Sequence, residues 1–278
     1  MKPSGREAEQ VPSDDALRLG VIGGSAFLEA AEVTGAEIRE VATPAGDVKV
    51  HVGADFAFLR RHGEGVYHPP HRIPHRAHVL ALESLGVRQV AAFNSTGSLH
   101  RALGPGDVVV PDDYLSFQPP PTFALDEYLH IVPSLDEGMR ALLIRAAEAA
   151  LASRDAVNPA EPLGRVTPRL ERTGVYAETR GPRFETPAEV RLLQGHARVV
   201  GMTAASEATL FQERGIGYGV LCIVDNWANG VGPAPLTLEA FQKQLARSGS
   251  LARAVLAELL RLWRGRSGSL APDGRTRL

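Results

Sequence analysis

An aromatic ring, a carboxylate and a side-chain amide occupy positions from which they could hold a flat, polar ring system. Phe184 and Glu185 follow a turn at Gly181. Asn226 comes just after the apolar run 219–224. An aromatic face stacks on a flat ring, a carboxylate accepts N–H groups, and an amide both donates and accepts hydrogen bonds. Together, these side chains would suit a heterocycle that carries a carbonyl group.

A second set of residues, in the first third of the chain, has the types that bind an oxyanion. Gly24 and Ser25 follow a short apolar run and could offer backbone N–H groups and a hydroxyl to a phosphate. Arg61 follows a predicted strand, and its guanidinium is a fork of donors suited to a dianion, with His62 beside it. The structural alternatives are a plain glycine turn and a solvated basic turn.

Two further segments place polar groups at the ends of predicted elements. Asn94 and Ser95 end an apolar run, where they could face an anion and a sugar or simply form a polar turn. Thr203 begins a predicted helix, so that its hydroxyl and the helix N-terminus could both face an anion. The alternative makes Thr203 a helix cap and Glu207 an ordinary residue of the helix surface.

Histidines are concentrated between residues 62 and 78, which raises the question of a metal site. Prolines at positions 69, 70 and 74 interrupt any helix there, so that His71 and His75 are not expected to share a regular turn. No carboxylate or cysteine lies between His68 and His78. We therefore expect a polar loop beside an anion site, and no metal.

Strands and helices are predicted to alternate through one domain. Helices are expected over residues 75–86, 136–153, 187–195, 203–214 and 236–264, and strands over 17–22, 36–60, 87–93, 106–111, 166–178, 199–201 and 218–225. The polar residues above fall at strand ends, where open α/β sheets bind ligands. The predicted fold is a single α/β domain over residues 17–264, with a mixed, mostly parallel central sheet flanked by helices, between disordered tails at 1–16 and 265–278.

Composition excludes several classes of function. The 278 residues carry a net charge of −2, so nothing draws the chain to nucleic acid or to an anionic membrane. There is a single cysteine, Cys222, so no disulfide can form within the chain, and a reducing compartment is expected. No apolar stretch is long enough to span a bilayer and no secretion signal is visible, which predicts a cytoplasmic protein.

In order, these motifs resemble those of the trimeric purine nucleoside phosphorylases, and more closely the 5′-methylthioadenosine phosphorylase branch. The resemblance covers about residues 17–262 and rests on the segments 21–25, 61–63, 94–98, 181–186, 201–207 and 224–228. It implies a nucleoside phosphorylase-like fold and cleavage of an N-glycosidic bond by inorganic phosphate, which is a co-substrate. It also implies a homotrimer, with no metal and no cofactor.

The resemblance also implies a role for each matching residue. Those expected to bind phosphate are Ser25, Arg61, His62, Asn94, Ser95 and Thr203, and Asn94 and Ser95 would also face the ribose. Met202 would lie against the ribose and Phe184 would stack on the base. Glu185 would accept the purine N1–H, and Asn226 would contact O6 and N7, so that both stabilise charge on the departing base. His130 would reach the 5′ substituent of a nucleoside bound in a neighbouring subunit.

Departures from the family pattern indicate the substrate. Adenine-specific members carry aspartates where this chain has Asn226 and Ala228, and an asparagine can donate to a carbonyl at C6. Leu238 stands where inosine-type members place a histidine, which implies an apolar 5′ pocket. We therefore expect S-methyl-5′-thioinosine to yield hypoxanthine and 5-methylthioribose 1-phosphate. The alternatives are a purine nucleoside phosphorylase that acts on inosine or guanosine and a methylthioadenosine phosphorylase. A phosphate-independent nucleosidase and a non-catalytic nucleoside-binding protein are two further alternatives.

Overall fold

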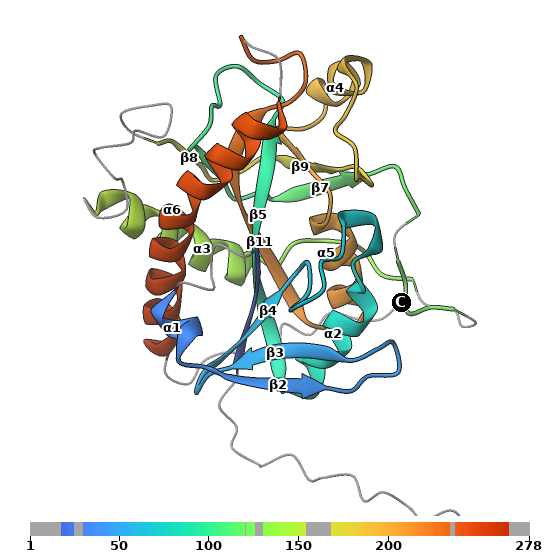
Figure 1. Ribbon diagram of the computed structural model, residues 1–278, viewed down its shortest axis with the longest axis vertical. Helices are drawn as coiled ribbons and strands as arrows, with labels where there is room; N and C mark the ends of the chain where they lie inside the picture. Colours follow the sequence, from blue (N-terminus) through green and yellow to red (C-terminus); the bar gives the residue numbers. More distant parts are fainter. Residues whose placement is uncertain are drawn as a thin grey trace, which may run out of the picture.

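A large mixed β-sheet forms the centre of the molecule, with helices on both of its faces (Figure 1). The computed structural model describes residues 18–24, 30–119, 121–125, 130–153, 168–233 and 237–266. Both predicted tails lie outside these ranges, except for residues 265 and 266. The described part confirms a single α/β fold with a mixed, mostly parallel sheet.

One half of the sheet is built from the first segments of the chain. Its strands, in spatial order, are β2 (Glu37–Val41), β3 (Val48–Val52), β4 (Phe56–Arg60), β1 (Arg18–Gly23) and β5 (Val87–Ser98). β1 runs parallel to both β4 and β5, whereas β2, β3 and β4 are joined in antiparallel fashion. β1 and β4 therefore end at the same edge of the sheet as β5.

The other half of the sheet branches from β5. On one side, β11 (Gly217–Trp227) runs parallel to β5 along most of its length, and it continues to β6 (Val108–Val109) and β8 (Leu170–Glu171). On the other side, the end of β5 pairs with β10 (Val199–Gly201), which leads to β9 (Val175–Glu178) and β7 (Asp113–Ser116). β5 is therefore the strand on which both halves meet.

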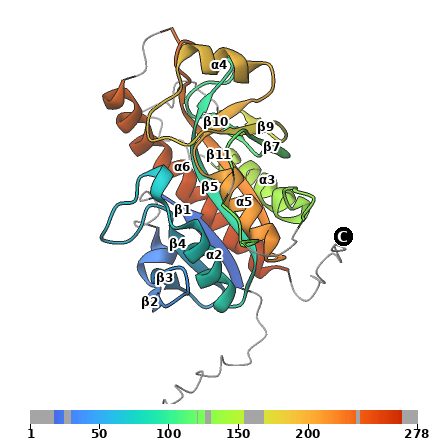
Figure 2. The same cartoon turned by 90° about the vertical axis from the view of Figure 1, so that its right-hand side faces the viewer.

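Two helical layers cover the sheet. Figure 1 shows α3 (Glu137–Ala152) and α6 (Leu238–Arg264) on one side, with the short α1 (Ala31–Thr34) near the foot of α6. The other side carries α2 (His75–Ser84) and α5 (Ala204–Glu213), and α4 (Pro187–Gln194) lies at the far end of the sheet (Figure 2). Each layer closes its own apolar core against one face of the sheet.

Two of the predicted helix starts, those of α3 and α4, are confirmed by side-chain caps. The side chain of Asp136 accepts a hydrogen bond from the amide of Met139 and begins α3. Thr186 and Glu189 form a reciprocal capping box at α4, with Pro187 in the first turn. These local signals could be read from the sequence because a cap needs only neighbouring residues.

β5 differs from the prediction at its end. The apolar run stops at Phe93, and the polar segment 94–98 was expected to break the strand. The structure continues the strand to Ser98, because that segment pairs with β11 on one edge and with β10 on the other. Polar side chains are thereby carried on a regular strand, which fixes their directions more firmly than a turn would.

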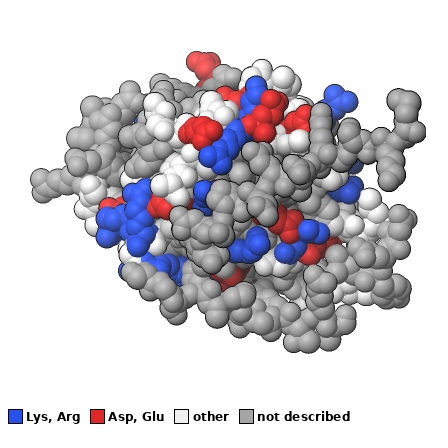
Figure 3. Space-filling model, turned by 90° about the horizontal axis from the view of Figure 1, so that it is seen from below, with Lys and Arg blue, Asp and Glu red and all other residues white. Residues whose placement is uncertain are grey.

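Charged side chains of both signs lie next to one another on the surface. Seen from below, the described acidic and basic residues are interspersed on this face (Figure 3). Within the described residues, no helix is long and apolar enough to cross a membrane.

Candidate active site

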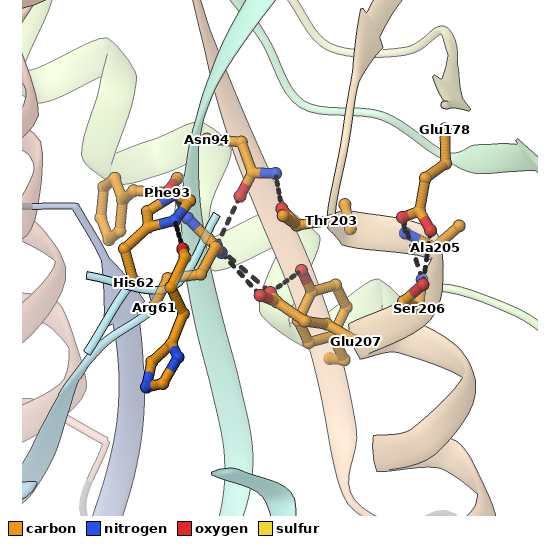
Figure 4. A network of polar contacts seen from close by, with 12 residues as sticks. Arg61, His62, Phe93, Asn94, Glu178, Thr203, Ala205, Ser206 and Glu207 are labelled. Carbon is orange, nitrogen blue, oxygen red and sulfur yellow. Dashed lines mark hydrogen bonds and ion pairs between the residues drawn. The ribbon is translucent and has the colours of Figure 1, made fainter. Parts of the chain in front are cut away.

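Several predicted site residues meet in one buried polar network between the sheet and α5 (Figure 4). Arg61 comes directly after β4, Asn94 lies in β5, and Thr203 is the residue before α5. Because these elements end or begin at the same edge of the sheet, residues far apart in sequence are brought within hydrogen-bonding distance.

Arg61 forms a buried ion pair with Glu207. Its Nε lies 2.6 Å from Oε1 of Glu207 and its Nη2 lies 3.2 Å from Oε2, and the two residues are only 4% and 2% exposed. Burial alone would lower the pKa of Arg61 and raise that of Glu207. The opposite charge and the hydrogen bonds of the partner outweigh burial in both cases, so the pKa of Arg61 is raised and that of Glu207 is lowered. The alternative of Glu207 as an ordinary surface residue is therefore wrong.

Asn94 connects this ion pair to Thr203. Its Oδ1 accepts from Nη2 of Arg61 at 2.6 Å, and its Nδ2 donates to Oγ1 of Thr203 at 2.9 Å. A further Arg61 bond runs from Nη1 to the carbonyl oxygen of Phe93, at 2.8 Å. On the other side, the hydroxyl of Tyr218 donates to Oε2 of Glu207 at 2.8 Å. Arg61 and Thr203 are thus parts of one continuous hydrogen-bonded chain.

The N-terminus of α5 is already occupied by the chain itself. The amides of Ala205 and Ser206 donate to Oε2 of Glu178 at 2.6 and 3.0 Å, and the amide of Thr203 donates to the hydroxyl of Tyr176 at 3.2 Å. Burial raises the pKa of Glu178, although these hydrogen bonds oppose the shift. The expectation that these amides face an external anion is therefore wrong. The Thr203 hydroxyl takes no part in these bonds, so its predicted role is unchanged.

His62 lies beside the network in a defined tautomer. Its Nδ1 is 2.8 Å from the carbonyl oxygen of His68, so Nδ1 must carry a proton, and in the neutral ring Nε2 is then an acceptor. Burial lowers the pKa of His62, although the bond to His68 opposes this. The ring also stacks on Tyr67, with the centroids 5.3 Å apart. A neutral His62 would have to gain a proton before it could donate to a dianion.

His75 and His78 are packed inside rather than solvated in a polar loop. A 3₁₀ turn at Pro70–Arg72 precedes them, and α2 begins at His75, so that His71 and His75 do not share a helical turn, as predicted. Burial lowers the pKa of His75 to about 4 and that of His78 to about 3, so both rings are neutral at physiological pH. Among the described residues, no group of three or more His, Cys, Asp or Glu side chains is arranged to hold a metal ion.

Glu185 and Asn226 are held by hydrogen bonds of their own, apart from the Arg61 network. Glu185 is buried, and its Oε1 accepts from the hydroxyl of Thr179 at 2.6 Å. Nδ2 of Asn226 donates to the carbonyl oxygen of Trp227 at 2.8 Å, which fixes the amide and leaves one N–H on Nδ2. A Cβ added at Gly97 would lie 3.2 Å from that nitrogen, so a glycine at this point of β5 allows Asn226 its position.

The turn before Phe184 is held against Met202. Gly181 has a φ of +62°, a conformation that favours glycine, and a Cβ there would lie 2.5 Å from Sδ of Met202, so the methionine side chain would have to shift. Phe184 is 37% exposed, which leaves part of its ring accessible. Phe184 thus offers a partly accessible ring, beside the buried carboxyl group of the next residue, Glu185.

Residues 18–261 match the model of a protein family described as the phosphorylase superfamily. The chain belongs to the phosphorylase superfamily. This match extends over nearly all of the predicted domain, and it agrees with the resemblance of the motifs.

Individual relatives narrow the position of this phosphorylase within the superfamily. It is 36% identical to a "Probable 6-oxopurine nucleoside phosphorylase" of Archaeoglobus fulgidus, over 77% of this chain and 83% of the relative. It is 38% identical to a "Probable S-methyl-5′-thioinosine phosphorylase" of Methanothermobacter thermautotrophicus, over 80% and 75%. A methylthioadenosine phosphorylase from Schistosoma mansoni, solved in complex with adenine, superimposes with a TM-score of 0.76 at 27% identity, over 90% and 93%. The phosphorylase is thus a purine nucleoside phosphorylase of the methylthioadenosine phosphorylase branch.

Other predicted site residues of this phosphorylase are either not described or lie away from the contacts described for the network. Ser25 lies outside the described residues, and Leu238 begins α6 with a side chain that is not described. His130 is exposed. Ser95 is exposed as well, and its side chain interacts with Asp225 rather than with the Arg61 network.

Sequence reasoning missed the roles of Glu207 and Tyr218 in the Arg61 network, of Tyr176 and Glu178 at the start of α5, and of Asp225 beside Asn226. A signal existed for Glu207, because it is an acidic residue among the apolar positions of α5 one turn after Thr203. Tyr176 and Tyr218 gave none, since an aromatic residue in a buried strand is ordinary core until its hydroxyl finds a partner.

Asp225 is a buried carboxyl group directly before Asn226. It is 2% exposed, its Oδ1 accepts from the hydroxyl of Ser248 on α6 at 2.5 Å, and the pairing of β11 with β5 shifts by one residue at this point. Burial raises the pKa of Asp225 to about 6, although Ser248 and Ser95 oppose the shift. The carboxyl therefore connects the strand end at Asn226 to α6.

Replacing Asp225 by asparagine should change how stability depends on pH. The folded protein holds this proton more tightly than the unfolded chain, so the stability of the parent protein falls as pH rises from the unfolded pKa of 3.8 through the folded pKa of about 6. Above that range, Asp225→Asn should be more stable by up to about 3 kcal/mol, at about 1.4 kcal/mol per pKa unit, and below about pH 4 the two should be equal. Urea unfolding of both proteins between about pH 4 and pH 8 measures the difference. A constant difference across the range would contradict the assignment.

Proposed function

We propose that this phosphorylase cleaves the N-glycosidic bond of a 6-oxopurine nucleoside with inorganic phosphate, and that S-methyl-5′-thioinosine is its preferred substrate. The products are hypoxanthine and 5-methylthioribose 1-phosphate. The observation that carries the proposal is the amide of Asn226, which is fixed by Trp227 and stands where the adenine-specific pattern has an aspartate; the buried carboxyl group of Glu185 supports it.

The base half of the proposal follows from hydrogen-bonding capacity. One N–H of Asn226 is used by Trp227, which leaves the other for the carbonyl oxygen O6, while Oδ1 can accept from a protonated N7. Thr179 uses Oε1 of Glu185, which leaves Oε2 for the purine N1–H. The amino group of adenine would meet the N–H of Asn226, and such a donor–donor contact leaves buried groups unpaired.

The phosphate half follows from the predicted ligands Ser25, Arg61, His62, Asn94, Ser95 and Thr203. As the C1′–N9 bond lengthens, its electron pair moves to the purine and the ribosyl group becomes cationic. A phosphate oxygen then bonds to C1′ from the opposite face. The proton of the hydrogen phosphate dianion is transferred to the departing purine anion, which leaves as the neutral base. Interactions of Asn226 and Glu185 with that base strengthen in the transition state. The reaction uses phosphate as a co-substrate and requires no cofactor.

The 5′ end separates the proposed substrate from unmodified nucleosides. Leu238, at the start of α6, would make an apolar pocket for the methylthio group, and His130 of a neighbouring subunit would complete it in a homotrimer. Relatives named for 6-oxopurine nucleosides and for S-methyl-5′-thioinosine both support a 6-oxopurine base. The second of these names also supports a methylthio group at the 5′ end.

Base release from S-methyl-5′-thioinosine, methylthioadenosine and inosine, each with and without inorganic phosphate, tests the proposal directly. We expect strict dependence on phosphate and the highest kcat/KM for S-methyl-5′-thioinosine. Equal release without phosphate would identify a nucleosidase instead. A preference for inosine would reject the apolar 5′ pocket, and a preference for methylthioadenosine would reject the role of Asn226.

A further inference from the structure

The donors of Arg61 are almost entirely used within the protein. A guanidinium has five N–H groups. Those on Nε and Nη2 are bound by Glu207 and Asn94, and one on Nη1 by the carbonyl oxygen of Phe93. A single N–H on Nη1 is left for a ligand. In this arrangement, the guanidinium of Arg61 therefore cannot bind a dianion through two parallel hydrogen bonds, contrary to the expectation from the sequence.

Arg61 is also kept in place because moving it would leave the buried carboxylate of Glu207 without its counter-ion. If its guanidinium turned toward an anion, the carboxylate of Glu207 would remain buried with only the hydroxyl of Tyr218 as a partner. A buried charge that loses its counter-ion is strongly unfavourable. The ion pair is therefore a fixed part of the site rather than a pair that opens when an anion binds.

The fixed guanidinium determines how Asn94 is oriented. Because a guanidinium can only donate, the amide atom that faces it must be the oxygen, so Nδ2 faces Thr203. Nδ2 is a donor, and the oxygen of the Thr203 hydroxyl must therefore accept. The proton of that hydroxyl is then directed to some other acceptor, and none is found for it among the residues that the structure describes. The oxygen of a bound phosphate would supply that acceptor.

We propose that Glu207 is a positioning residue of the anion site, which acts through Arg61 and Asn94 to hold the Thr203 hydroxyl as a donor to the substrate oxyanion. The inference deepens the proposed function and rests on its phosphate site. Glu207 does not touch the anion itself. Its carboxylate fixes the direction of each hydrogen bond in the chain from Glu207 to Thr203.

A double-mutant cycle between Glu207→Gln and Thr203→Val tests this chain, with titration of inorganic phosphate by calorimetry as the readout. A glutamine would present an N–H to Arg61 or to Tyr218 and so disturb the order of donors. Each single change should weaken phosphate binding about tenfold, as for the loss of one well-oriented bond to a charged group. The double variant should bind about as weakly as either single variant, because both changes remove the same donor.

Matched controls keep a change of fold apart from a change in the site. Glu171→Gln alters another bidentate arginine pair, with Arg198, away from the network, and it should leave phosphate affinity unchanged. Should Glu207→Gln fail to fold, Tyr218→Phe removes one partner of Glu207 without changing charge, and the cycle is repeated with it.

The possible outcomes are distinct. Independent losses that multiply in the double variant, or phosphate binding that is unchanged or tighter in Glu207→Gln, would overturn the role of Glu207. If the parent protein bound phosphate but cleaved no nucleoside, the proposed function would fail while the cycle still tested this inference. A parent protein that bound no phosphate would overturn both.

Discussion

Replacing Asn226 by alanine lowers kcat/KM for a 6-oxopurine nucleoside by about a hundredfold or more, in line with the loss of a typical oxyanion-type donor. The amide is fixed by Trp227 before the substrate arrives, so its free N–H needs no reorganisation when negative charge develops on the base. Most of the loss should appear in kcat, because the interaction strengthens as the glycosidic bond breaks. Steady-state kinetics with S-methyl-5′-thioinosine and saturating phosphate measure it.

Asn229→Ala is the matched control for this change. It removes an amide of the same type three residues later, whose Nδ2 donates to the backbone carbonyl of Glu185, at 3.2 Å. We expect a much smaller loss of activity for this variant. Near-normal turnover of Asn226→Ala would reject its assignment. Asn226→Asp adds a second test, because it should move the preference from 6-oxopurine toward adenine nucleosides.

Replacing Arg61 by methionine destabilises the fold by about 3–5 kcal/mol, because it leaves the carboxylate of Glu207 buried without its counter-ion. That is a large part of the total stability of a typical domain, which is about 5–15 kcal/mol. The midpoint of thermal unfolding should fall by roughly 10 °C for a chain of this size. Urea and thermal unfolding at neutral pH measure both quantities.

The double variant Arg61→Met/Glu207→Gln separates charge from packing. It removes both charges, and the oxygen of the glutamine can still accept from the hydroxyl of Tyr218. Much of the lost stability should therefore return, although activity should not. A double variant that is less stable than Arg61→Met alone would show that the penalty comes from packing rather than from an unpaired buried charge.

The alternation of strands and helices could be predicted because its signals are local. Apolar runs, glycine turns and caps such as Asp136 and Thr186 depend on residues a few positions apart. The extent of β5 could not be predicted in the same way. Its polar end is a strand only because β10 and β11 pair with it, and those partners lie more than a hundred residues later.

The site was predictable in its residue types but not in its connections. Asn94, Arg61 and Thr203 were singled out, yet nothing in their spacing shows that one amide links the other two. Burial decides the state of Glu207 and Asp225, and burial is a property of the assembled fold. The same holds for Glu178, the last residue of β9, whose carboxylate binds amides in the first turn of α5.

The residues proposed to bind the anion and those proposed to bind the base are held by separate side-chain hydrogen bonds. Among the described residues, the network of Arg61, Asn94, Thr203 and Glu207 shares no side-chain hydrogen bond with the Thr179–Glu185 pair or with the bond from Asn226 to Trp227. Changes in separate networks tend to add independently. A lineage can therefore alter the base it recognises while the anion end is inherited intact.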